Sequence, residues 1–281
     1  MADPFQIQYR QEFIASFEQR QSLLRDTVTT EIELKGNRAV FLVAGSGSDE
    51  AVTRGANGMI PAKTDTETQY TATLQEWHDL RRKTGFNIFA SQGNQRDIMQ
   101  QNSMAVINRK IDSDIIGALS ASTTTAGSAT TIPSVNLFMN CQVKLSNAGV
   151  PWDSNITLLC TPAFLAYLEA APEFSSADYV DTKPNQNADG EWRDKAMAYR
   201  WRNSLIISHP NLSGIGTSSE ISYMYHKSAI GHAVDTAGLK SLVGVDEEQD
   251  YSWARTSIFM GSKLLQTSGV VKITADGSAL A

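Results

Sequence analysis

Four histidines are the side chains best suited to catalysis or metal binding, and their spacing forms no known motif: His78, His209, His226 and His232. None lies in an HExxH zinc sequence, a CxxC partner set or a GxSxG nucleophile elbow. The last two are six residues apart, a poor spacing for sharing a metal on one helix face. The sequence therefore predicts solvated or core histidines, with no catalytic residue and no metal site.

The acidic residues give no cation site either. Asp112 and Asp114 are two positions apart in a predicted helix, so their side chains point about 200° from each other and do not converge on one metal or proton. We assign Asp112 to a structural ion pair, with Arg109 or with a neighbouring subunit. The acidic run DEEQD at 246–250 lacks the alternating oxygen ligands and central glycine of a calcium loop, which predicts a solvated loop.

Two glycine-rich segments, GSGS at 45–48 and GIG at 214–216, weakly resemble phosphate loops. Both lack the third glycine, the lysine and the following helix, so turns explain them and no cofactor is predicted.

Trp192 and Trp201 alternate with three arginines, Arg193, Arg200 and Arg202. Such spacing is compatible with stacking on single-stranded nucleic acid. Indoles at a subunit junction with arginines at its rim fit interface composition better, so we expect an interface there.

The composition is that of an ordinary globular chain: 281 residues, 41% hydrophobic and 19% charged. The net charge is −6 and the cations are scattered, which argues against tight or sequence-specific nucleic-acid binding. No apolar run is long enough to span a bilayer, and the N-terminus lacks the pattern of a signal peptide. Cys141 and Cys160 are predicted to be reduced and buried.

The longest predicted element is a spine helix at 94–120, read from NQRDIMQQNSMAVINRKIDSDIIGALS. Asn94 can cap it, and Asp97 places a carboxylate in its first turn. Apolar residues at steps of three and four define one face. They are Met104, Ile107, Ile111, Ile115 and Ala118. A helix of about 40 Å spans a domain of this size.

A long β-hairpin is predicted before the spine helix. Residues 27–44 are rich in β-branched side chains, 45–58 are too rich in Gly, Ser, Asp and Asn for regular structure, and 63–77 are again extended. An isolated hairpin is marginal in water, so this one must rest on its own domain or on another chain. Residues 5–24 have mostly helical spacing and predict an amphipathic arm.

The rest of the chain predicts a compact alternation of helices and strands. The expected elements are a low-complexity connector ending at 134, a helix at 135–149, a strand at 156–160, a helix from Pro162, a projecting loop, a strand at 205–207, a strand and helical turn within 219–234, and two closing β segments split at 268–269. We expect the closing strands to pair beside the spine helix.

The order of these segments resembles the major capsid proteins of tailed bacteriophages, the Hong Kong-type fold that encapsulin compartments share. The likeness covers nearly the whole chain. The arm, the extended loop and the helix ending INRKIDSDIIGAL are similar to that family's arm, loop and peripheral domain. The run LSNAGVPWDSNITLLCTPAFLAYLEAAPEFSSADYV resembles the opening of its axial domain. YMYHKSAIGHAV continues the match, and DYSWARTSIFMGSKLLQTSGVVKI is similar to the strands that return to the peripheral domain.

The resemblance implies an α+β fold with an N-terminal arm, an extended β loop, a peripheral domain and an axial α/β domain. The implied boundaries are 1–26 for the arm, 27–75 for the loop, 76–134 and 236–281 for the peripheral domain with its spine helix 94–120, and 135–235 for the axial domain.

The resemblance further implies a non-enzymatic subunit that self-assembles into pentamers and hexamers forming the icosahedral head of a virion. Assembly is expected in the host bacterial cytoplasm, around double-stranded DNA that the shell encloses without reading its sequence. A portal and a possible decoration protein are implied partners, and no membrane is involved. The interface candidates are Gly45, Gly47, Arg54, Gly55, Gly58, Arg109, Asp112, Trp192 and Trp201.

Two departures from the founding member of that family carry expectations. Only residues 1–26 precede the first predicted strand, where that protein has a long cleaved scaffolding segment, so a separate scaffolding protein is implied. That protein also joins subunits through a loop lysine and an asparagine. Residues 36–62 contain Arg38 and Arg54 but no lysine, with Lys35 and Lys63 only at the base. We therefore predict a non-covalent shell.

Three alternatives remain open at this point. An encapsulin-like compartment of the same fold would assemble without a helper and load a cargo enzyme. A hydrolase with an unrecognised Ser, His and Asp set would label at one serine with an activity probe. A β-rich adhesion or tail component would form tubes instead of closed shells.

Overall fold

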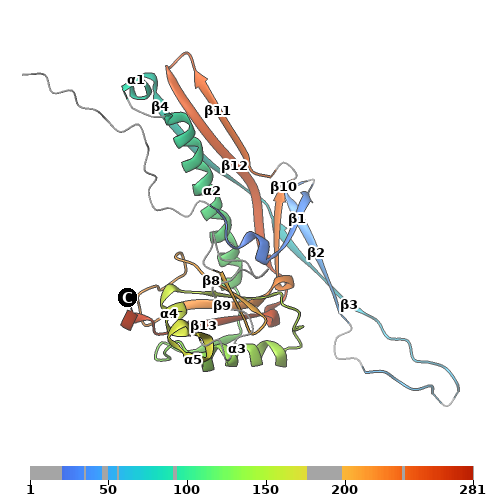
Figure 1. The fold of residues 1–281 in the computed structure, drawn as a ribbon. Helices are drawn as coiled ribbons and strands as arrows, with labels where there is room; N and C mark the ends of the chain where they lie inside the picture. Colours follow the sequence, from blue (N-terminus) through green and yellow to red (C-terminus); the bar gives the residue numbers. More distant parts are fainter. Residues whose placement is uncertain are drawn as a thin grey trace, which may run out of the picture.

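The computed structural model describes residues 21–34, 36–45, 50–55, 57–90, 94–175, 198–235 and 238–280. Three parts are visible in Figure 1: a five-stranded sheet alongside a long helix, a six-stranded sheet below it, and a two-stranded hairpin that leaves the body. Predictions for residues 1–20 therefore lie outside the described residues.

The long helix α2 (Gln95–Ser120) confirms the predicted spine. Asn94 caps it, its side chain accepting a hydrogen bond from the backbone N–H of Asp97. Ile107, Ile111 and Ile115 are buried as expected. Met104 and Ala118 are only half-buried, whereas Ser103 and Leu119 are covered. The buried face is therefore rotated slightly from the one predicted.

The spine helix packs along a sheet built around one long strand. The sheet runs β1-β10-β12-β11, and β4 also pairs with β12. Most of β4 lies in a stretch for which no element was predicted. Alternate residues, from Trp77 to Lys83, are half-buried, as in a strand with one face on the body. The elements are β1 (Thr29–Leu34), β4 (Gln75–Thr84), α1 (Gly85–Ala90), β10 (Ile230–Asp235), β11 (Lys240–Asp246) and β12 (Tyr251–Leu264).

The second sheet has the strand order β5-β13-β9-β6-β8-β7 and a separate apolar core. Ser134 and Thr161 cap its two main helices, each accepting a hydrogen bond from the backbone N–H three residues later. The elements are β5 (Thr125–Gly127), α3 (Val135–Asn147), β6 (Ile156–Cys160), α4 (Pro162–Ala170), α5 (Pro172–Ser175), β7 (Ala198–Trp201), β8 (Ser204–Ser208), β9 (Glu220–His226) and β13 (Val270–Ala275). The predictions for α3, β6, α4 and β8 are confirmed.

Two strands belong to different sheets from the ones predicted. β10, assigned to the axial segment 135–235, pairs with β12 beside the spine helix. β13, expected beside the spine helix, pairs with β9 and β5 in the second sheet. The chain changes sheets at two short 3-10 helices, η2 (Lys227–Ala229) and η3 (Thr267–Gly269). These two turns touch, since a Cβ at Gly269 would lie 2.8 Å from that of Ala229.

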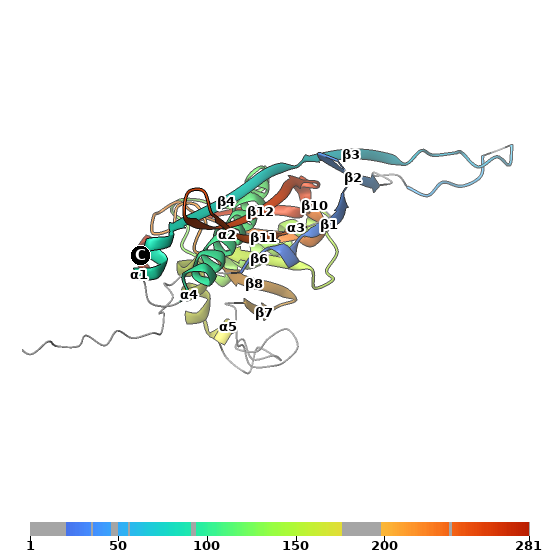
Figure 2. The ribbon, with the colours of Figure 1, turned by 90° about the horizontal axis from the view of Figure 1, so that it is seen from above.

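The predicted hairpin is present and extends from the body. β2 (Arg38–Gly45) pairs antiparallel with β3 (Thr66–Thr73) in a register from Arg38↔Thr73 to Gly45↔Thr66. Both views show the described residues between the two strands, 50–55 and 57–65, projecting beyond the sheets (Figures 1 and 2). The base of the hairpin contacts the body, where Ala39, Phe41 and Ala72 pack on Ala233 and Leu265.

His232 on β10 predicts a pH dependence of stability. Its ring is fully buried, its Nδ1–H donates to Ser262 Oγ over 2.9 Å, and no described residue forms a hydrogen bond with its Nε2. Burial lowers the pKa of His232 from 6.5 to about 4; nearby Asp114 opposes this shift and Arg25 adds to it.

The His232 imidazole binds a proton at higher pH in the unfolded chain than in the folded one. The free energy of unfolding should therefore fall by up to about 3 kcal/mol as pH drops from about 6.5 to about 4. Denaturant unfolding at several pH values measures the slope. His232→Gln should flatten it in that window, and an unchanged slope would contradict the assignment.

Candidate functional site: exposed apolar faces and a buried junction at the hairpin root

The hairpin carries apolar side chains on both of its faces, although only one face contacts the body. On β2, Ala39 and Phe41 point inward, whereas Val40 and Leu42 are 60% and 57% exposed. Gln69 and Thr71 lie opposite them on β3. We call Val40, Leu42, Gln69 and Thr71 the outer hairpin face. Burying each large aliphatic would gain about 1.5–3 kcal/mol, so this face is suited to contact with another chain.

The tip of the hairpin continues this apolar character. Val52, Met59 and Ile60 are 47%, 75% and 63% exposed. A turn holds the last two in place: Gly55 N–H donates to Met59 O over 3.0 Å, and Gly58 N–H donates to Gly55 O over 2.8 Å. Gly58 has φ +71°, a conformation that favours glycine. The tip therefore presents large apolar groups far from the core of its own chain.

A buried carboxylate joins the start of the described chain to both sheets. Asp112 on α2 is fully buried and accepts hydrogen bonds from Ser22 Oγ over 2.6 Å and from the backbone N–H groups of Leu23 and Leu24 over 3.1 and 3.2 Å. His209, just after β8, lies 3.2 Å away through Nε2. We call Ser22, Leu23, Leu24, Asp112 and His209 the arm junction.

The hydrogen bonds of the arm junction favour the ionised form of Asp112 and select one tautomer of the His209 ring. Burial alone would raise the pKa of Asp112, but hydrogen bonds from His209, Ser22 and the backbone outweigh it and lower that pKa. The Asn211 N–H donates to His209 Nδ1 over 3.1 Å, so the proton of neutral His209 is on Nε2 and points at the carboxylate. These contacts hold residues 22–24 against α2 and the end of β8.

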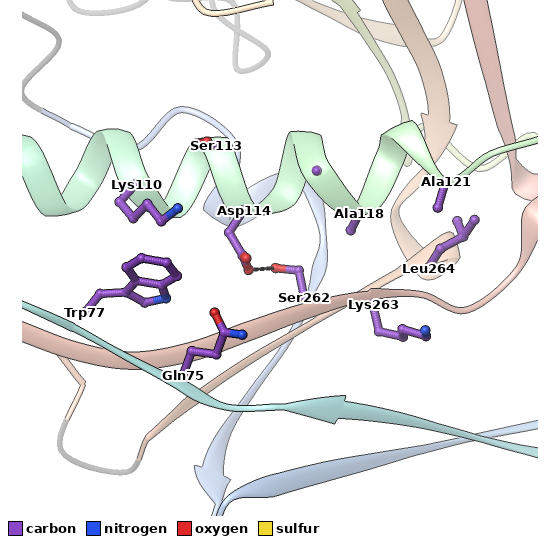
Figure 3. A pocket seen from close by; sticks show the side chains of 11 residues that line it. Gln75, Trp77, Lys110, Ser113, Asp114, Ala118, Ala121, Ser262, Lys263 and Leu264 are labelled. Atoms are coloured by element: carbon purple, nitrogen blue, oxygen red, sulfur yellow. Dashed lines mark hydrogen bonds between the residues drawn. The ribbon is translucent and has the colours of Figure 1, made fainter.

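A groove of about 470 Å³ lies between α2, β4 and β12 (Figure 3). Lys110 Nζ sits 3.8 Å from the centroid of the Trp77 ring, and Ser262 Oγ donates to Asp114 Oδ2 over 2.6 Å. The remaining lining includes Gln75, Lys263 and small side chains of α2. Among the described residues that line the groove there is no histidine or cysteine, and the one carboxylate is hydrogen-bonded to Ser262.

In the chain Asp153, His226 and Ser228, the histidine lies between an aspartate and a serine, which is the order of a catalytic triad. Asp153 Oδ1 lies 2.9 Å from His226 Nε2, and His226 Nδ1 lies 2.8 Å from Ser228 Oγ. The same Nδ1 accepts the Ser228 N–H over 3.2 Å, which caps η2. Hydrogen bonds from Asn155 and then His226 lower the pKa of Asp153 to about 2. The contacts account for a structural cap.

The predicted interface residues fall in different environments. Gly45 ends β2 and is exposed, as are Arg54, Gly55 and Gly58 on the tip. These four remain interface predictions. Gly47 and Trp192 lie outside the described residues.

Three further candidates belong to the interior or lie close to it. Trp201 is 4% exposed, with its ring 4.9 Å from Phe138 and 5.1 Å from Phe174, so its expected place at a subunit junction is wrong. Asp112 is structural as predicted, but its described partners are the arm junction of its own chain. Arg109 is half-buried on α2.

The sequence reading missed the exposed aliphatics of the outer hairpin face and tip. Residues 39–44 read as one continuous apolar run, which conceals the alternation between inward and outward side chains. His209 and Ser22 were also missed, since contacts across 97 and 90 positions leave no local signal.

Across the ranges that the structure describes, no three His, Cys, Asp or Glu side chains gather as a metal site. No helix in those ranges is long and apolar enough to cross a membrane.

Comparison with known proteins agrees with this geometry. The family model for phage capsid proteins matches residues 1–276. A chain of Mycobacterium phage Che8 superposes with a TM-score of 0.75 at 17% identity, covering 97% of this chain and 98% of that one. The head structure of Helicobacter pylori bacteriophage KHP40 gives 0.72 at 10% identity, with 96% and 95% covered. The capsid of Ralstonia phage GP4 gives 0.71 at 10% identity, with 98% and 96% covered.

At such identities the superpositions establish the fold, which confirms the predicted Hong Kong-type architecture. No curated protein sequence matches the chain. The family match favours a phage head over an encapsulin compartment and points to a structural role. Spanning residues 1–276, it shows that the chain belongs to the phage capsid protein family.

Proposed function

We propose that this protein is the major capsid subunit of a tailed phage and assembles into pentamers and hexamers that close into an icosahedral head. The observation that carries the proposal is the outer hairpin face, whose aliphatic side chains Val40 and Leu42 are exposed in a member of the capsid family. Head-to-tail contacts of one sequence close into rings when the rotation between copies permits.

In this proposal the hairpin lies across a neighbouring subunit of the same ring. Val40, Leu42, Met59 and Ile60 then lose their exposure to water, and the gain is about 25 cal/mol for each Å² of apolar area buried. Charge pairs set the geometry of the contact more than its strength. The Gly45, Gly55 and Gly58 positions allow one loop to fit rings of five and six.

The remaining partners are part of the same proposal. A separate scaffolding protein guides assembly, a portal occupies one vertex, and a decoration protein is a further candidate for the outer surface. With a net charge of −6, the subunit encloses double-stranded DNA without reading its sequence.

Electron microscopy of the purified chain, alone and with its scaffolding protein, tests the proposal. Closed shells or rings of five and six subunits are expected. A compact monomer at high protein concentration under both conditions would overturn it, and tubes would point to a tail component.

The assembled shell should be held together without covalent bonds between subunits. Arg54 is the described cation nearest the turn at the tip in sequence, and Lys63 lies beyond it, where its Nζ donates to the Glu50 carbonyl of its own chain. Denaturing gel electrophoresis of purified shells should give one band at the mass of a single chain. A ladder of covalent oligomers would contradict this prediction.

A further inference from the structure

Two of the outer strands of the spine sheet, β4 and β11, differ in how their free edges are protected. β4 carries charges along its length, at Glu76, Asp79, Arg81, Arg82 and Lys83. Charged side chains on an edge strand discourage pairing with another chain. β11 has charges only at its two ends, Lys240 and Asp246, and the residues between them are SLVGV. In the described part of the chain its sole pairing partner is β12.

The uncharged middle of β11 is also apolar and exposed. Leu242, Val243 and Val245 are 49%, 41% and 51% exposed, although they lie in a regular strand paired over its whole length with β12. Figure 1 shows β11 at the outer border of the sheet. The spine helix fixes the strand from one side, where Gln100 Nε2 donates to Ser241 Oγ over 3.1 Å. A rigid, apolar and unprotected edge of this kind is a template for another strand.

The sequence of β11 is complementary to itself when reversed. In an antiparallel pair centred on Val243, Lys240 of one copy lies opposite Asp246 of the other, at both ends of the contact. Opposite charges placed across a strand pair are stabilising, and like charges are destabilising. A strand with both charges of one sign would repel its own copy, and this strand does not.

The same register also matches shapes. It places Leu242 of each copy opposite Gly244 of the other. The Trp253 ring of the neighbouring strand lies over Gly244, where a Cβ would be only 2.6 Å from it. The partner's leucine therefore meets the face of an indole across the glycine, an apolar contact available only in this register.

We propose that β11 pairs with β11 of a second copy, antiparallel about a two-fold axis at Val243, so that two five-stranded sheets join edge to edge. The inference rests on the proposed function and deepens it. A two-fold contact is self-complementary and pairs two subunits only, so it cannot build a ring. It is therefore the contact between subunits of adjacent rings, whereas the hairpin makes the contacts within a ring.

A single cysteine tests the two-fold axis directly. Position 243 faces its own copy, with Cβ atoms about 4.5–5.5 Å apart, whereas the two copies of position 245 are staggered by about 13 Å. Oxidised shells of Val243→Cys should therefore yield a covalent dimer and nothing larger, as seen in a non-reducing denaturing gel. Shells of the matched control Val245→Cys should remain monomeric. The native Cys141 and Cys160 are buried and form no disulfide.

The outcomes separate this inference from the proposed function. If the wild type forms shells but oxidised Val243→Cys shells give only the monomer band, the β11 pairing alone is overturned. Equal cross-linking of the Val243→Cys and Val245→Cys shells would overturn it as well. Absence of rings and shells in the wild type would instead overturn the proposed function. If Val243→Cys lowers the yield of shells, Val243→Lys gives a second reading, because it sets two like charges face to face. The Val243→Lys protein should then form rings of five and six subunits that do not join into closed shells. Normal shells of Val243→Lys would contradict the pairing.

Discussion

Replacing Leu42 by aspartate should leave the subunit folded and abolish shell formation. Leu42 is 57% exposed and its neighbour across the hairpin is Gln69, so a carboxylate there stays solvated in the free subunit. Surface changes of this kind usually shift the free energy of unfolding by no more than about 0.5 kcal/mol. In the assembled shell the same carboxylate would be buried without a partner, which costs several kcal/mol at every copy of the contact.

Electron microscopy and sedimentation of the Leu42→Asp protein measure the loss of shells, and denaturant unfolding checks the fold. The matched control Leu42→Val keeps an apolar side chain and should assemble as the wild type does. Phe41→Ala provides the opposite pattern, because Phe41 is 7% exposed and packs on the body. It should lose about 3–5 kcal/mol of stability. Normal shells from Leu42→Asp would show that the outer hairpin face is not an assembly surface.

Replacing Asp112 by alanine should destabilise the subunit by about 3–5 kcal/mol, the usual cost of removing one partner of a buried charged network. The substitution leaves four donors without this acceptor: the Ser22 hydroxyl, the backbone N–H groups of Leu23 and Leu24, and the His209 imidazole. Chemical denaturation measures the loss. The matched control Asp114→Ala, on the same helix but only half-buried, removes one hydrogen bond to Ser262 and should cost about 1 kcal/mol.

The Asp112 carboxylate also contributes to the acid sensitivity of the fold. Its pKa is lowered in the folded chain, so its stabilising effect is complete above the unfolded value of about 3.9 and is lost as pH falls through the folded value. Unfolding curves of Asp112→Ala should therefore be flatter with pH in the strongly acidic range. Equal losses for the Asp112 and Asp114 variants would contradict the role given to the arm junction.

Local signals in the sequence were sufficient to predict the three longest helices, α2, α3 and α4, and several strands. The spine helix has its cap and apolar period within residues 94–120, and α4 follows a proline at its first position. The pairing of strands has no such local signature. β13 follows β12 after one short turn yet enters the other sheet. Its partner β9 is more than forty positions away, so no local pattern indicates the pairing.

The error at Trp201 has a specific cause. Indoles alternating with arginines are typical of an interface rim and equally typical of a half-buried strand. In β7 the alternation is that of a strand, with Tyr199 and Trp201 facing the core and Arg200 half-buried between them. The candidate site was therefore predicted in outline, as a projecting hairpin, whereas its residues required the register of β2 against β3.

The path of the chain from hairpin to sheet has a mechanical consequence. β3 ends at Thr73 and β4 begins at Gln75, so one extended segment runs from the projecting hairpin into the sheet beside the spine helix. Gly261 lets β12 cross closely at this point, since a Cβ there would lie 2.3 Å from the Thr73 carbonyl oxygen. Tension applied along the hairpin by a moving neighbour is thus carried lengthwise into β4. The 10 residues of β4 all pair with β12, so they bear this load together in shear and do not peel apart one at a time.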